Sequence, residues 1–345
     1  MDILICADAQ PQVGTGHLRR MLTLAGSLIE SAPNIQLTIR TSTLGASIAR
    51  EIGPRGLQIA EASCSPEAVK AHLENKRYAA VILDNYHWNE QNEAPLRALT
   101  DCLCVIDDLA DRPHDVDLLL DQNAYHSDRD YVGLAPSDCT LLAGAEFCLL
   151  SRQFRTEQVR TANPLLLESA APIFVSLGGG DPNRDLLPIT QTLLANTPFS
   201  LTLATGSHIA DAEALQSLVK QHSDRVELIF DSPRVAEQML KSKFAVASGG
   251  TMTWERAAVG LPSLCLIVAD NQYKSAHWLA DRNVHDIFDI RASWSPKKLA
   301  QAALALGSDK KRQTDYFNAS RALSLENGVV RVATTLLKKI NATQY

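Results

Sequence analysis

Short apolar runs of strand length alternate with helical patterns along almost the whole chain, and this alternation most constrains how the chain can fold. Strands that alternate with helices predict parallel sheets connected by crossover helices. The strands predicted in the first half are Ile3–Ala7, Gln36–Arg40, Ala79–Leu83, Cys102–Ile106 and Leu118–Leu120, with a strand-like pair at Leu141–Leu142, and those in the second half are Pro172–Leu177, Ser200–Ala204, Val226–Phe230, Phe244–Ala247 and Ser263–Ile267.

The series of strands restarts in the middle of the chain, after a polar segment of mixed charge between Arg152 and Glu168. A chain of 345 residues is also long enough for two domains that each bury a core. We therefore predict an α/β fold with two Rossmann-like domains facing a central cleft. The first covers residues 1–155 and is joined by a C-terminal helix at 326–340, and the second covers residues 165–325.

Each predicted domain opens with a strand that leads into glycines. Gly14 and Gly16 follow the first strand of the chain, and Gly178 and Gly179 follow the first strand of the second domain. In parallel sheets of this kind, ligands bind beyond the carboxyl ends of the strands. Both glycine loops are therefore expected to border the cleft and the ligand in it.

Composition excludes several classes of protein. Hydrophobic residues make up 46% and charged residues 21% of the chain, and the net charge is −6 with no basic stripe, so a nucleic-acid partner is not expected. No apolar run approaches the roughly 20 residues of a membrane span, and the N-terminus carries no leader pattern. Most of the seven cysteines lie in apolar runs, as buried thiols do, which favours a cytoplasmic protein.

The first glycine loop reads Gly14-Thr-Gly16-His17-Leu-Arg19 and opens a predicted helix. Arg19 replaces the third glycine of a dinucleotide-binding loop, and no acidic residue ends a second strand about 20 residues later, so the pattern gives little support to NAD binding. His17 has two interpretations at this point. It is either a helix-start residue that caps the turn or a functional histidine facing a ligand.

A second glycine loop, Ser248-Gly249-Gly250, follows a predicted strand, and Thr251 begins the next helix. Small residues and free backbone N–H groups at a helix N-terminus suit a diphosphate. Glu255 lies about one turn further on, where its carboxylate could accept hydrogen bonds from ribose hydroxyls. A lone glutamate is ordinarily a solvated residue on a helix face, but the flanking glycines favour the nucleotide interpretation.

Two further segments end predicted strands. Asn271 and Gln272 follow the strand after Gly249, and their amides suit sugar hydroxyls and N-acyl groups, although a plain polar loop is nearly as good an interpretation. Asp107 and Asp108 could hold a metal, but the spacing suggests no third oxygen ligand. A helix-capping or loop role is therefore preferred for this pair, and neither a metal nor a cofactor is expected.

These motifs occur together in one order: G-T-G-H-L-R-R, L-D-N-Y, V-I-D-D-L-A-D-R, L-L-L-D-Q-N, S-L-G-G-G-D, S-G-G-T-M-T-W-E and D-N-Q. Across essentially the whole chain, this combination resembles the PseG family, the UDP-2,4-diacetamido-2,4,6-trideoxy-β-L-altropyranose hydrolases of pseudaminic acid biosynthesis. More distantly, G-x-G-H and S-G-x-x-T-x-x-E look like the GT-B glycosyltransferase that adds N-acetylglucosamine in peptidoglycan synthesis. The loop Ser248-Gly249-Gly250 is more glycine-rich than in some PseG members and is closer to the transferases.

The resemblance implies a GT-B fold and a metal-independent enzyme that breaks the bond between C1 and oxygen with inversion. The product sugar would enter a nonulosonic acid pathway that serves flagellin or surface glycans, with other pathway enzymes as further partners. By resemblance, His17 is the catalytic base, Tyr86 lies near the sugar, Glu255 binds the nucleotide and Asn271 belongs to the site. The segment after Phe230 is expected to face the uracil. The remaining substrate-binding residues expected are Gly14, Gly16, Arg20, Asn85, Gly178, Gly179, Phe230, Ser248, Gly249, Gly250, Thr251 and Gln272.

The chemistry explains why a histidine would occupy the first loop. UDP leaves readily when helix N-termini disperse its charge, so the missing element is an activated water molecule. A histidine near neutral pH can supply it, which typically contributes about 10²- to 10⁴-fold in rate. Three alternatives stay open: a GT-B glycosyltransferase with a UDP-amino sugar donor, an inactive nucleotide-sugar binder, and a nucleotide-sugar 2-epimerase.

Overall fold

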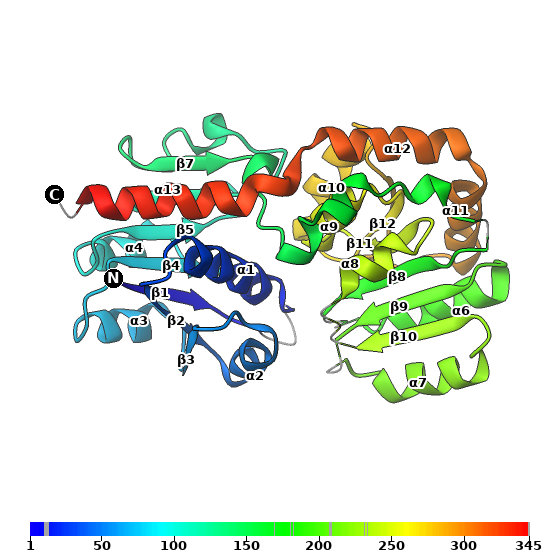
Figure 1. Cartoon of the computed structure of the whole chain (residues 1–345), viewed down its shortest axis with the longest axis horizontal. Coiled ribbons are helices and arrows are strands. Elements are labelled where there is room, and N and C mark those ends of the chain that lie inside the picture. Colours follow the sequence, from blue (N-terminus) through cyan, green and yellow to red (C-terminus); the bar gives the residue numbers. More distant parts are fainter. Residues whose placement is uncertain are drawn as a thin grey trace. The chain divides into compact units, whose positions relative to one another are not determined.

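The computed structural model describes residues 1–9, 14–168, 170–179, 181, 183–206, 209–230, 232 and 234–343. The chain forms two compact units, which Figure 1 shows in blue-to-green with a red C-terminal helix for one and in green-to-orange for the other. Unit 1 comprises Met1–Ser151 and Leu325–Tyr345, and unit 2 comprises Arg152–Ser324.

Unit 1 is built on a parallel sheet with seven strands among the described residues, in the order β3-β2-β1-β4-β5-β6-β7. The strands are β1 (Asp2–Ala7), β2 (Gln36–Thr41), β3 (Gln58–Glu61), β4 (Ala80–Asp84), β5 (Leu103–Ile106), β6 (Leu118–Asp121) and β7 (Thr140–Ala143). Every residue of β4, β5 and β6 is buried, as expected of central parallel strands that are covered on both faces.

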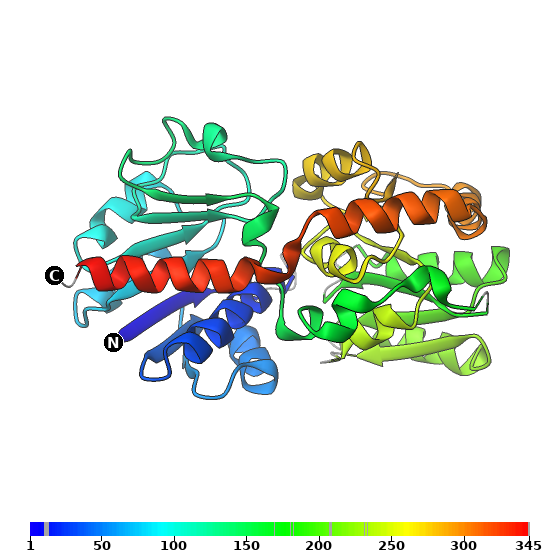
Figure 2. The same ribbon diagram turned by 45° about the horizontal axis from the view of Figure 1, so that its top comes forward.

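Helices cover both faces of this sheet. They are α1 (Gly16–Ser31), α2 (Thr43–Ile52), α3 (Pro66–Leu73), α4 (Glu90–Arg97) and α13 (Gly328–Thr343), with short 3₁₀ segments at Asp128–Tyr131, Ala145–Phe147 and Leu325–Asn327. Alternate residues of β1 enter different cores: Ile3 packs with Met21 of α1 and Leu336 of α13, whereas Leu4 packs with Leu73 and Leu96. The C-terminal helix α13, red in Figures 1 and 2, therefore returns to unit 1 and completes its core beside α1.

Unit 2 contains a second parallel sheet, with six strands in the part of the chain that the structure describes and the order β10-β9-β8-β11-β12-β13. The strands are β8 (Ile173–Gly178), β9 (Leu201–Thr205), β10 (Val226–Phe230), β11 (Ala245–Ser248), β12 (Ser263–Ile267) and β13 (Asp286–Asp289). The helices are α5 (Glu157–Thr161), α6 (Leu186–Asn196), α7 (Ala212–Gln221), α8 (Val235–Leu240), α9 (Met252–Val259), α10 (Tyr273–Ala280), α11 (Pro296–Ser308) and α12 (Lys310–Ala322), with 3₁₀ segments at Arg152–Phe154, Pro164–Leu166 and Asp270–Gln272.

All ten predicted strands are present, with bounds that differ by at most a residue or two, and Leu141–Leu142 lies in β7. The structure adds β3 and β13, which the sequence did not indicate. Both are short strands of four residues at a sheet edge, and their side chains are half-buried or exposed. Edge strands of this kind lack the continuous apolar run that marks a buried strand.

Within the described residues, every helix is too short or too polar to cross a membrane. All seven cysteines are free thiols, and six of them are buried. Burial raises the pKa of Cys102 to about 12 and that of Cys104 well above its usual range, as expected of structural thiols that stay protonated.

Candidate functional site

Carboxylates lie at the ends of three neighbouring strands of the unit 1 sheet. Leu83 of β4 is in register with Val105 of β5, and Ile106 of β5 is in register with Leu120 of β6. The next residues along these strands therefore lie at one edge, the carboxyl edge of the sheet. They include Asp84, the pair Asp107 and Asp108, and Asp121.

His17 approaches this edge from the first turn of α1. Gly14, two residues before the helix, has a φ of +88°, a conformation that favours glycine. Within the described residues, the N-cap residue Thr15 makes no side-chain capping hydrogen bond, and His17 does not cap the turn either, because its ring reaches β4. The helix-capping interpretation of His17 is thus replaced by a contact across the sheet edge.

The ring of His17 is held by Asp84, the last residue of β4. Nδ1 lies 2.6 Å from Oδ1 of Asp84, whose side chain is fully buried, while the His17 side chain is 11% exposed. A carboxylate oxygen only accepts hydrogen bonds, so a short contact requires the proton on Nδ1. Nε2 then keeps its lone pair and is the nitrogen that can accept a proton.

Arg20, one helical turn after His17, ties two of the carboxylates together. Its Nε donates to Oδ2 of Asp84 at 2.7 Å, and Nη2 donates to Oδ1 at 2.6 Å. Nη1 and Nη2 also donate to the two oxygens of Asp108, both at 2.8 Å. The guanidinium is only 5% exposed and lies 3.1 Å from Nδ1 of His17. The N–H donors of the guanidinium group are therefore engaged by carboxylates. The role of Arg20 as a substrate ligand stays a prediction.

These neighbours determine the charge of Asp84. Burial by itself would raise the pKa of this carboxyl group, but the positive charges and hydrogen bonds of Arg20 and His17 outweigh burial and lower its pKa to about 2. Asp84 is therefore ionised at every pH at which the protein would work. The His17 ring thus keeps a carboxylate on Nδ1 throughout.

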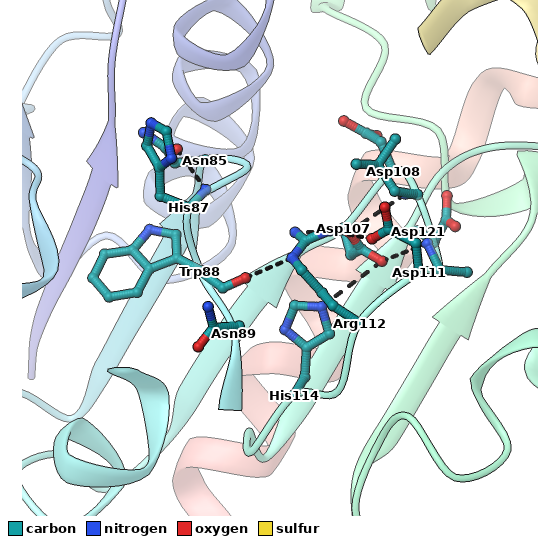
Figure 3. Close-up of polar contacts among 12 residues, drawn as sticks. Asn85, His87, Trp88, Asn89, Asp107, Asp108, Asp111, Arg112, His114 and Asp121 are labelled. Carbon is teal, nitrogen blue, oxygen red and sulfur yellow. Dashed lines mark hydrogen bonds and ion pairs between the residues drawn. The ribbon is translucent and has the colours of Figure 1, made fainter. Parts of the chain in front are cut away.

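Asn85 and Tyr86 follow Asp84 and are both half-buried. The ring of Tyr86 lies edge-on to that of His17, with the ring centroids 4.8 Å apart and an angle of 87°. Oδ1 of Asn85 accepts a hydrogen bond from the backbone N–H of His87 at 2.9 Å and shapes the turn, as Figure 3 shows. Tyr86 thus lies beside His17, and Asn85 supports the loop that carries Tyr86.

Asp107 is a loop residue, in line with the role preferred from the sequence. Its Oδ2 accepts hydrogen bonds from the backbone N–H of Ala110 at 2.8 Å and from the hydroxyl of Tyr131 at 3.0 Å, while Oδ1 pairs with Arg112 at 3.0 Å. Figure 3 shows Arg112 and His114 reaching toward Asp107. Across the described ranges, histidine, cysteine and acidic residues form no group of three or more that could hold a metal ion.

A second histidine lies at the end of β6. His126 contacts Oδ2 of Asp121 through Nδ1, and Oδ1 of Asp121 accepts hydrogen bonds from the backbone and side-chain nitrogens of Asn123 at 2.8 and 2.9 Å. Burial raises the pKa of Asp121, and the hydrogen bonds from His126 and Asn123 act in the opposite direction. Asp84, Asp121 and Asn123 stand in the motifs L-D-N-Y and L-L-L-D-Q-N, but the motifs alone assign no role to them, and His126 lies outside both motifs. The common signal was an acidic residue directly after a buried apolar run.

In unit 2, Gly249 and Gly250 separate β11 from α9. A Cβ atom on Gly249 would lie 3.2 Å from Sγ of Cys265 and 3.3 Å from Cβ of Gln272, so the loop needs glycine for close packing. Oε1 of Gln272 accepts hydrogen bonds from the backbone N–H groups of Gly249 at 3.3 Å and Val268 at 3.1 Å. Gln272 therefore braces the glycine loop.

The other residues predicted for a nucleotide also lie in unit 2. Thr251 and Asn271 are exposed, and Glu255 is half-buried on the first turn of α9. Gly178 ends β8, and Phe230, half-buried, ends β10. The structure thus brings Gly14, Gly16, His17, Arg20, Asn85 and Tyr86 to one end of the unit 1 sheet, and it brings Ser248, Gly249, Gly250, Thr251, Glu255 and Gln272 to the β11–α9 and β12–α10 turns of unit 2.

Arg256, next to Glu255, points into the protein and is 2% exposed. It donates to the carbonyl of Ser248 at 2.9 Å, to the hydroxyl of Ser263 at 3.1 Å and to that of Thr253 at 3.2 Å. Burial lowers the pKa of this guanidinium from its ordinary value. Arg256 thus fixes the strand end that carries the glycine loop.

Sequence comparison identifies two relatives. The chain is 25% identical over 282 residues to the UDP-2,4-diacetamido-2,4,6-trideoxy-beta-L-altropyranose hydrolase of Campylobacter jejuni, which covers 82% of this chain and 97% of that protein. It is 21% identical over 272 residues to an uncharacterized protein of Methanocaldococcus jannaschii, covering 77% of this chain and 55% of that protein. No protein-family model matches the chain. The similarity to a PseG hydrolase that the motifs predict is thereby confirmed.

Comparison with solved structures identifies the fold. The structure matches MurG of Acinetobacter baumannii with a TM-score of 0.64 at 13% identity, covering 98% of this chain and 99% of that chain. It matches UDP-glucose:anthocyanidin 3-O-glucosyltransferase in complex with UDP with a TM-score of 0.68 at 12% identity, covering 99% of both chains. It also matches MnaA of S. aureus, in a co-structure with UDP, with a TM-score of 0.64 at 11% identity, covering 99% of this chain and 97% of that chain. The chain therefore has the GT-B fold, an α/β architecture of two Rossmann-like units.

Proposed function

We propose that this protein hydrolyses a UDP-linked 2,4-diacetamido-2,4,6-trideoxyhexose to the free sugar and UDP, as a step of pseudaminic acid biosynthesis. The observation that carries the proposal is the pair of His17 and Asp84, in which an ionised carboxylate 2.6 Å from Nδ1 leaves Nε2 as the base. Similarity to a hydrolase of such a substrate over 82% of the chain supports the same conclusion.

In the proposed mechanism, Nε2 of His17 takes a proton from a water molecule. Nδ1 keeps its own proton, which stays hydrogen-bonded to the carboxylate of Asp84. The water oxygen bonds to C1 of the sugar, on the face opposite the nucleotide. The bond between C1 and oxygen breaks, and its electron pair leaves with the β-phosphate of UDP. His17 is then an imidazolium with a proton on each ring nitrogen, and it returns the proton on Nε2 to solvent. Asp84 orients the ring and stabilises the imidazolium formed in the reaction, as a buried carboxylate does for a catalytic histidine in other hydrolases.

Unit 2 would hold the UDP group. The backbone N–H groups that begin α9, after the small residues Gly249 and Gly250, suit the diphosphate, and Glu255 suits the ribose hydroxyls. No metal is needed in this scheme, because amide groups disperse the charge of the leaving group. Phe230, Asn271 and Gln272 complete the proposed nucleotide and sugar contacts.

Hydrolysis in ¹⁸O-labelled water tests the proposal directly. The heavy atom is expected on the free sugar and not on UDP, and the first-formed anomer is expected to be inverted. Label in the phosphate of UDP would show attack at phosphorus and would contradict the role given to His17. Incubation of the protein with a panel of UDP-sugars, with measurement of the UDP released from each, would identify the substrate.

A GT-B glycosyltransferase that uses a UDP-amino sugar donor is the second candidate. It is favoured by the fold, because the solved structures with this architecture include a glucosyltransferase in complex with UDP. Release of free sugar at the full rate without any acceptor would favour the hydrolase. Turnover that appears only after a sugar or lipid acceptor is added would favour the transferase.

A further inference from the structure

Unit 1 carries a second histidine–aspartate pair at the same sheet edge as His17 and Asp84. We infer that His126 is a sugar-binding residue, whose Nε2 accepts a hydrogen bond from the N–H of an acetamido group on the substrate. This inference rests on the proposed function, because it concerns the sugar of that reaction. It assigns a role to the motif L-L-L-D-Q-N, which the mechanism does not use.

The pair of His126 and Asp121 repeats the geometry of the first pair. Nδ1 of His126 contacts Oδ2 of Asp121, which ends β6 as Asp84 ends β4. The hydroxyl of Tyr131 lies 2.8 Å from Oδ2 of Asp121 and 3.0 Å from Oδ2 of Asp107, so the two carboxylates share its one proton. A carboxylate surrounded by donors acts as an acceptor, so the proton lies on Nδ1 of His126 and Nε2 is left as an acceptor.

The ring of His126 is fixed and its outer nitrogen is unused. Its centroid lies 4.1 Å from that of Tyr125 and 6.3 Å from that of Tyr131. The side chain is 7% exposed, and nothing in the described part of the chain hydrogen-bonds to Nε2. Nε2 itself is not among the buried unpartnered atoms, so water can reach it in the free protein and a donor group of a bound molecule can replace that water. This nitrogen is therefore suited to a polar group of a bound molecule.

Polar contacts connect this pair to the site around His17. Nδ2 of Asn123 donates to Oδ1 of Asp121 at 2.9 Å and lies 3.3 Å from Oδ1 of Asp108, which in turn holds Arg20. Figure 3 shows Asp108 and Asp121 close to each other at the strand ends. The two histidines therefore lie at the two ends of one hydrogen-bonded network.

The tyrosines form a second connection. Tyr86 lies edge-on to His17, and Tyr125 packs on His126. The two tyrosines are close enough for Tyr86 to contribute to the raised pKa of Tyr125, a shift caused first by burial and then by Asp121 and Asp108. The hydroxyl of Tyr125 also donates to the backbone carbonyl of Asp108 at 3.2 Å. Aromatic side chains thus line the edge between the two histidines.

The spacing fits a substituted sugar ring. Asp84 and Asp121 end strands on either side of β5, so about 10 Å separates them, at roughly 4.8 Å per strand. Water activated by His17 must attack C1, and a group bound at His126 must be remote from C1. An acetamido group across the ring from C1 satisfies this condition, and its N–H is a donor that matches the acceptor Nε2. A hydroxyl at that position could also donate to Nε2, but it lacks the acetyl group that could pack on Tyr125.

The test compares two substitutions of His126 in a background that cannot turn over. In a His17→Asn protein, calorimetry gives the affinities for UDP and for the UDP-diacetamido sugar. We expect His126→Phe, which keeps a ring but loses the acceptor, to weaken binding of the UDP-sugar by about three- to tenfold and to leave UDP binding unchanged. His126→Gln, which keeps an acceptor oxygen, should restore part of the loss. Equal losses for UDP and the UDP-sugar, or no loss for either, would overturn the assignment.

Turnover and unfolding measurements separate this inference from its alternatives. With His17 intact, His126→Phe should lower kcat/KM for the UDP-diacetamido sugar by the same factor, and it should also lower the midpoint of urea unfolding because the buried Asp121 loses a partner. His126→Gln should lower kcat/KM by a smaller factor. A lowered midpoint with equal losses in the Phe and Gln variants would show a purely structural role and overturn the inference. If the wild-type protein binds the UDP-sugar more tightly than UDP through His126 but never releases free sugar, the inference holds and the proposed hydrolysis fails.

Discussion

Nδ1 of His17 lies 2.6 Å from Oδ1 of Asp84, although 67 residues separate them in the sequence. The first turn of α1 and the end of β4 meet because β1 and β4 are neighbours, with Ala7 in register with Asp84. The pair is thus a direct consequence of the strand order. It fixes the orientation of the histidine that the proposed mechanism uses as its base.

Replacing either member of this pair should lower turnover without weakening nucleotide binding. We expect His17→Asn to reduce kcat by about 10²- to 10⁴-fold, as for a lost general base. Asp84→Asn should cost about 10²-fold or more, since an amide no longer enforces the tautomer with a proton on Nδ1. The double variant should be little worse than His17→Asn alone, because the two residues act as a unit.

Steady-state kinetics and UDP calorimetry on the same preparations check this prediction. UDP affinity should stay within about twofold of the wild-type value in all three variants, which also reports that unit 2 is intact. Near-normal turnover of His17→Asn would remove His17 from the mechanism. Full activity of Asp84→Asn would show that His17 does not need Asp84 to hold its proton on Nδ1.

Arg20 should matter more for stability than its position beside the first glycine loop suggests. Arg20→Met leaves the buried carboxylates of Asp84 and Asp108 without their shared cation, and breaking a buried pair typically costs about 3–5 kcal/mol. Urea unfolding measures this loss. Arg50→Met is the matched control, because Arg50 pairs with Glu61 on the surface, where an ion pair contributes less than about 1 kcal/mol. Similar losses in both variants would contradict the buried network.

The sequence predicts the sheets well because their strands are buried on both faces. All residues of β4 and β12 are buried, and each strand appears in the sequence as a continuous apolar run between polar turns. The edge strands β3 and β13 escape prediction because their pattern resembles that of a polar loop. Periodicity therefore identifies the covered centre of each sheet and loses its edges.

The candidate site is only partly predictable for a different reason. Glycine loops identify His17 and Gly249 because they are local patterns, whereas the partners of His17 depend on which strands are neighbours. Asp84, Asp108 and Asp121 each look like an acidic residue that ends a strand, a common event in any α/β chain. Only the strand order β1-β4-β5-β6 brings them together and shows which residues share a proton or a charge.

His114 should make the stability of the protein depend on pH. Burial would lower the pKa of this histidine, but hydrogen bonds and charges of Asp107 and Glu93 outweigh burial and raise it to about 9. A histidine whose pKa is higher in the folded than in the unfolded state stabilises the folded protein. This contribution is fully present below the unfolded pKa of about 6.5, and it is lost as the pH rises from about 6.5 to 9. The contribution is at most about 3 kcal/mol, from 1.36 kcal/mol per pKa unit.

Urea unfolding at pH 6 and at pH 9.5 checks this dependence, with His114→Asn as the comparison. The wild-type protein should lose stability between the two values relative to the variant, because only the wild type releases a proton from position 114. Nδ1 of His114 lies 2.8 Å from Oε1 of Glu93, so a fully buried carboxylate directly stabilises the charged form of this histidine. Parallel pH profiles for the two proteins would contradict the raised pKa.

Activity should persist after complete removal of divalent metal ions. The described residues offer no cluster of three or more metal-ligating side chains, and Asp107 and Asp108 are engaged by Arg112 and Arg20. We therefore expect the rate of UDP release to be unchanged by exhaustive EDTA treatment. Loss of activity that returns with Mg²⁺ or Mn²⁺ would contradict this prediction and would direct attention to Asp108.

Gly249 provides the sharpest test of the glycine loop in unit 2, because its neighbour Gly250 is a matched control. A Cβ atom at Gly249 would press on Sγ of Cys265 at 3.2 Å and on Gln272 at 3.3 Å, whereas one at Gly250 would meet only Nε2 of Gln272, at 3.9 Å. Gly249→Ala should therefore displace Gln272, whose Oε1 accepts hydrogen bonds from the backbone N–H groups of Gly249 and Val268. The substitution should lower the free energy of unfolding by about 1–3 kcal/mol.

We expect UDP affinity to fall by at least tenfold in Gly249→Ala. In Gly250→Ala it should fall by a smaller factor, at nearly wild-type stability. Equal effects of the two substitutions on UDP binding and unfolding would show that close packing against Gln272 does not maintain the loop.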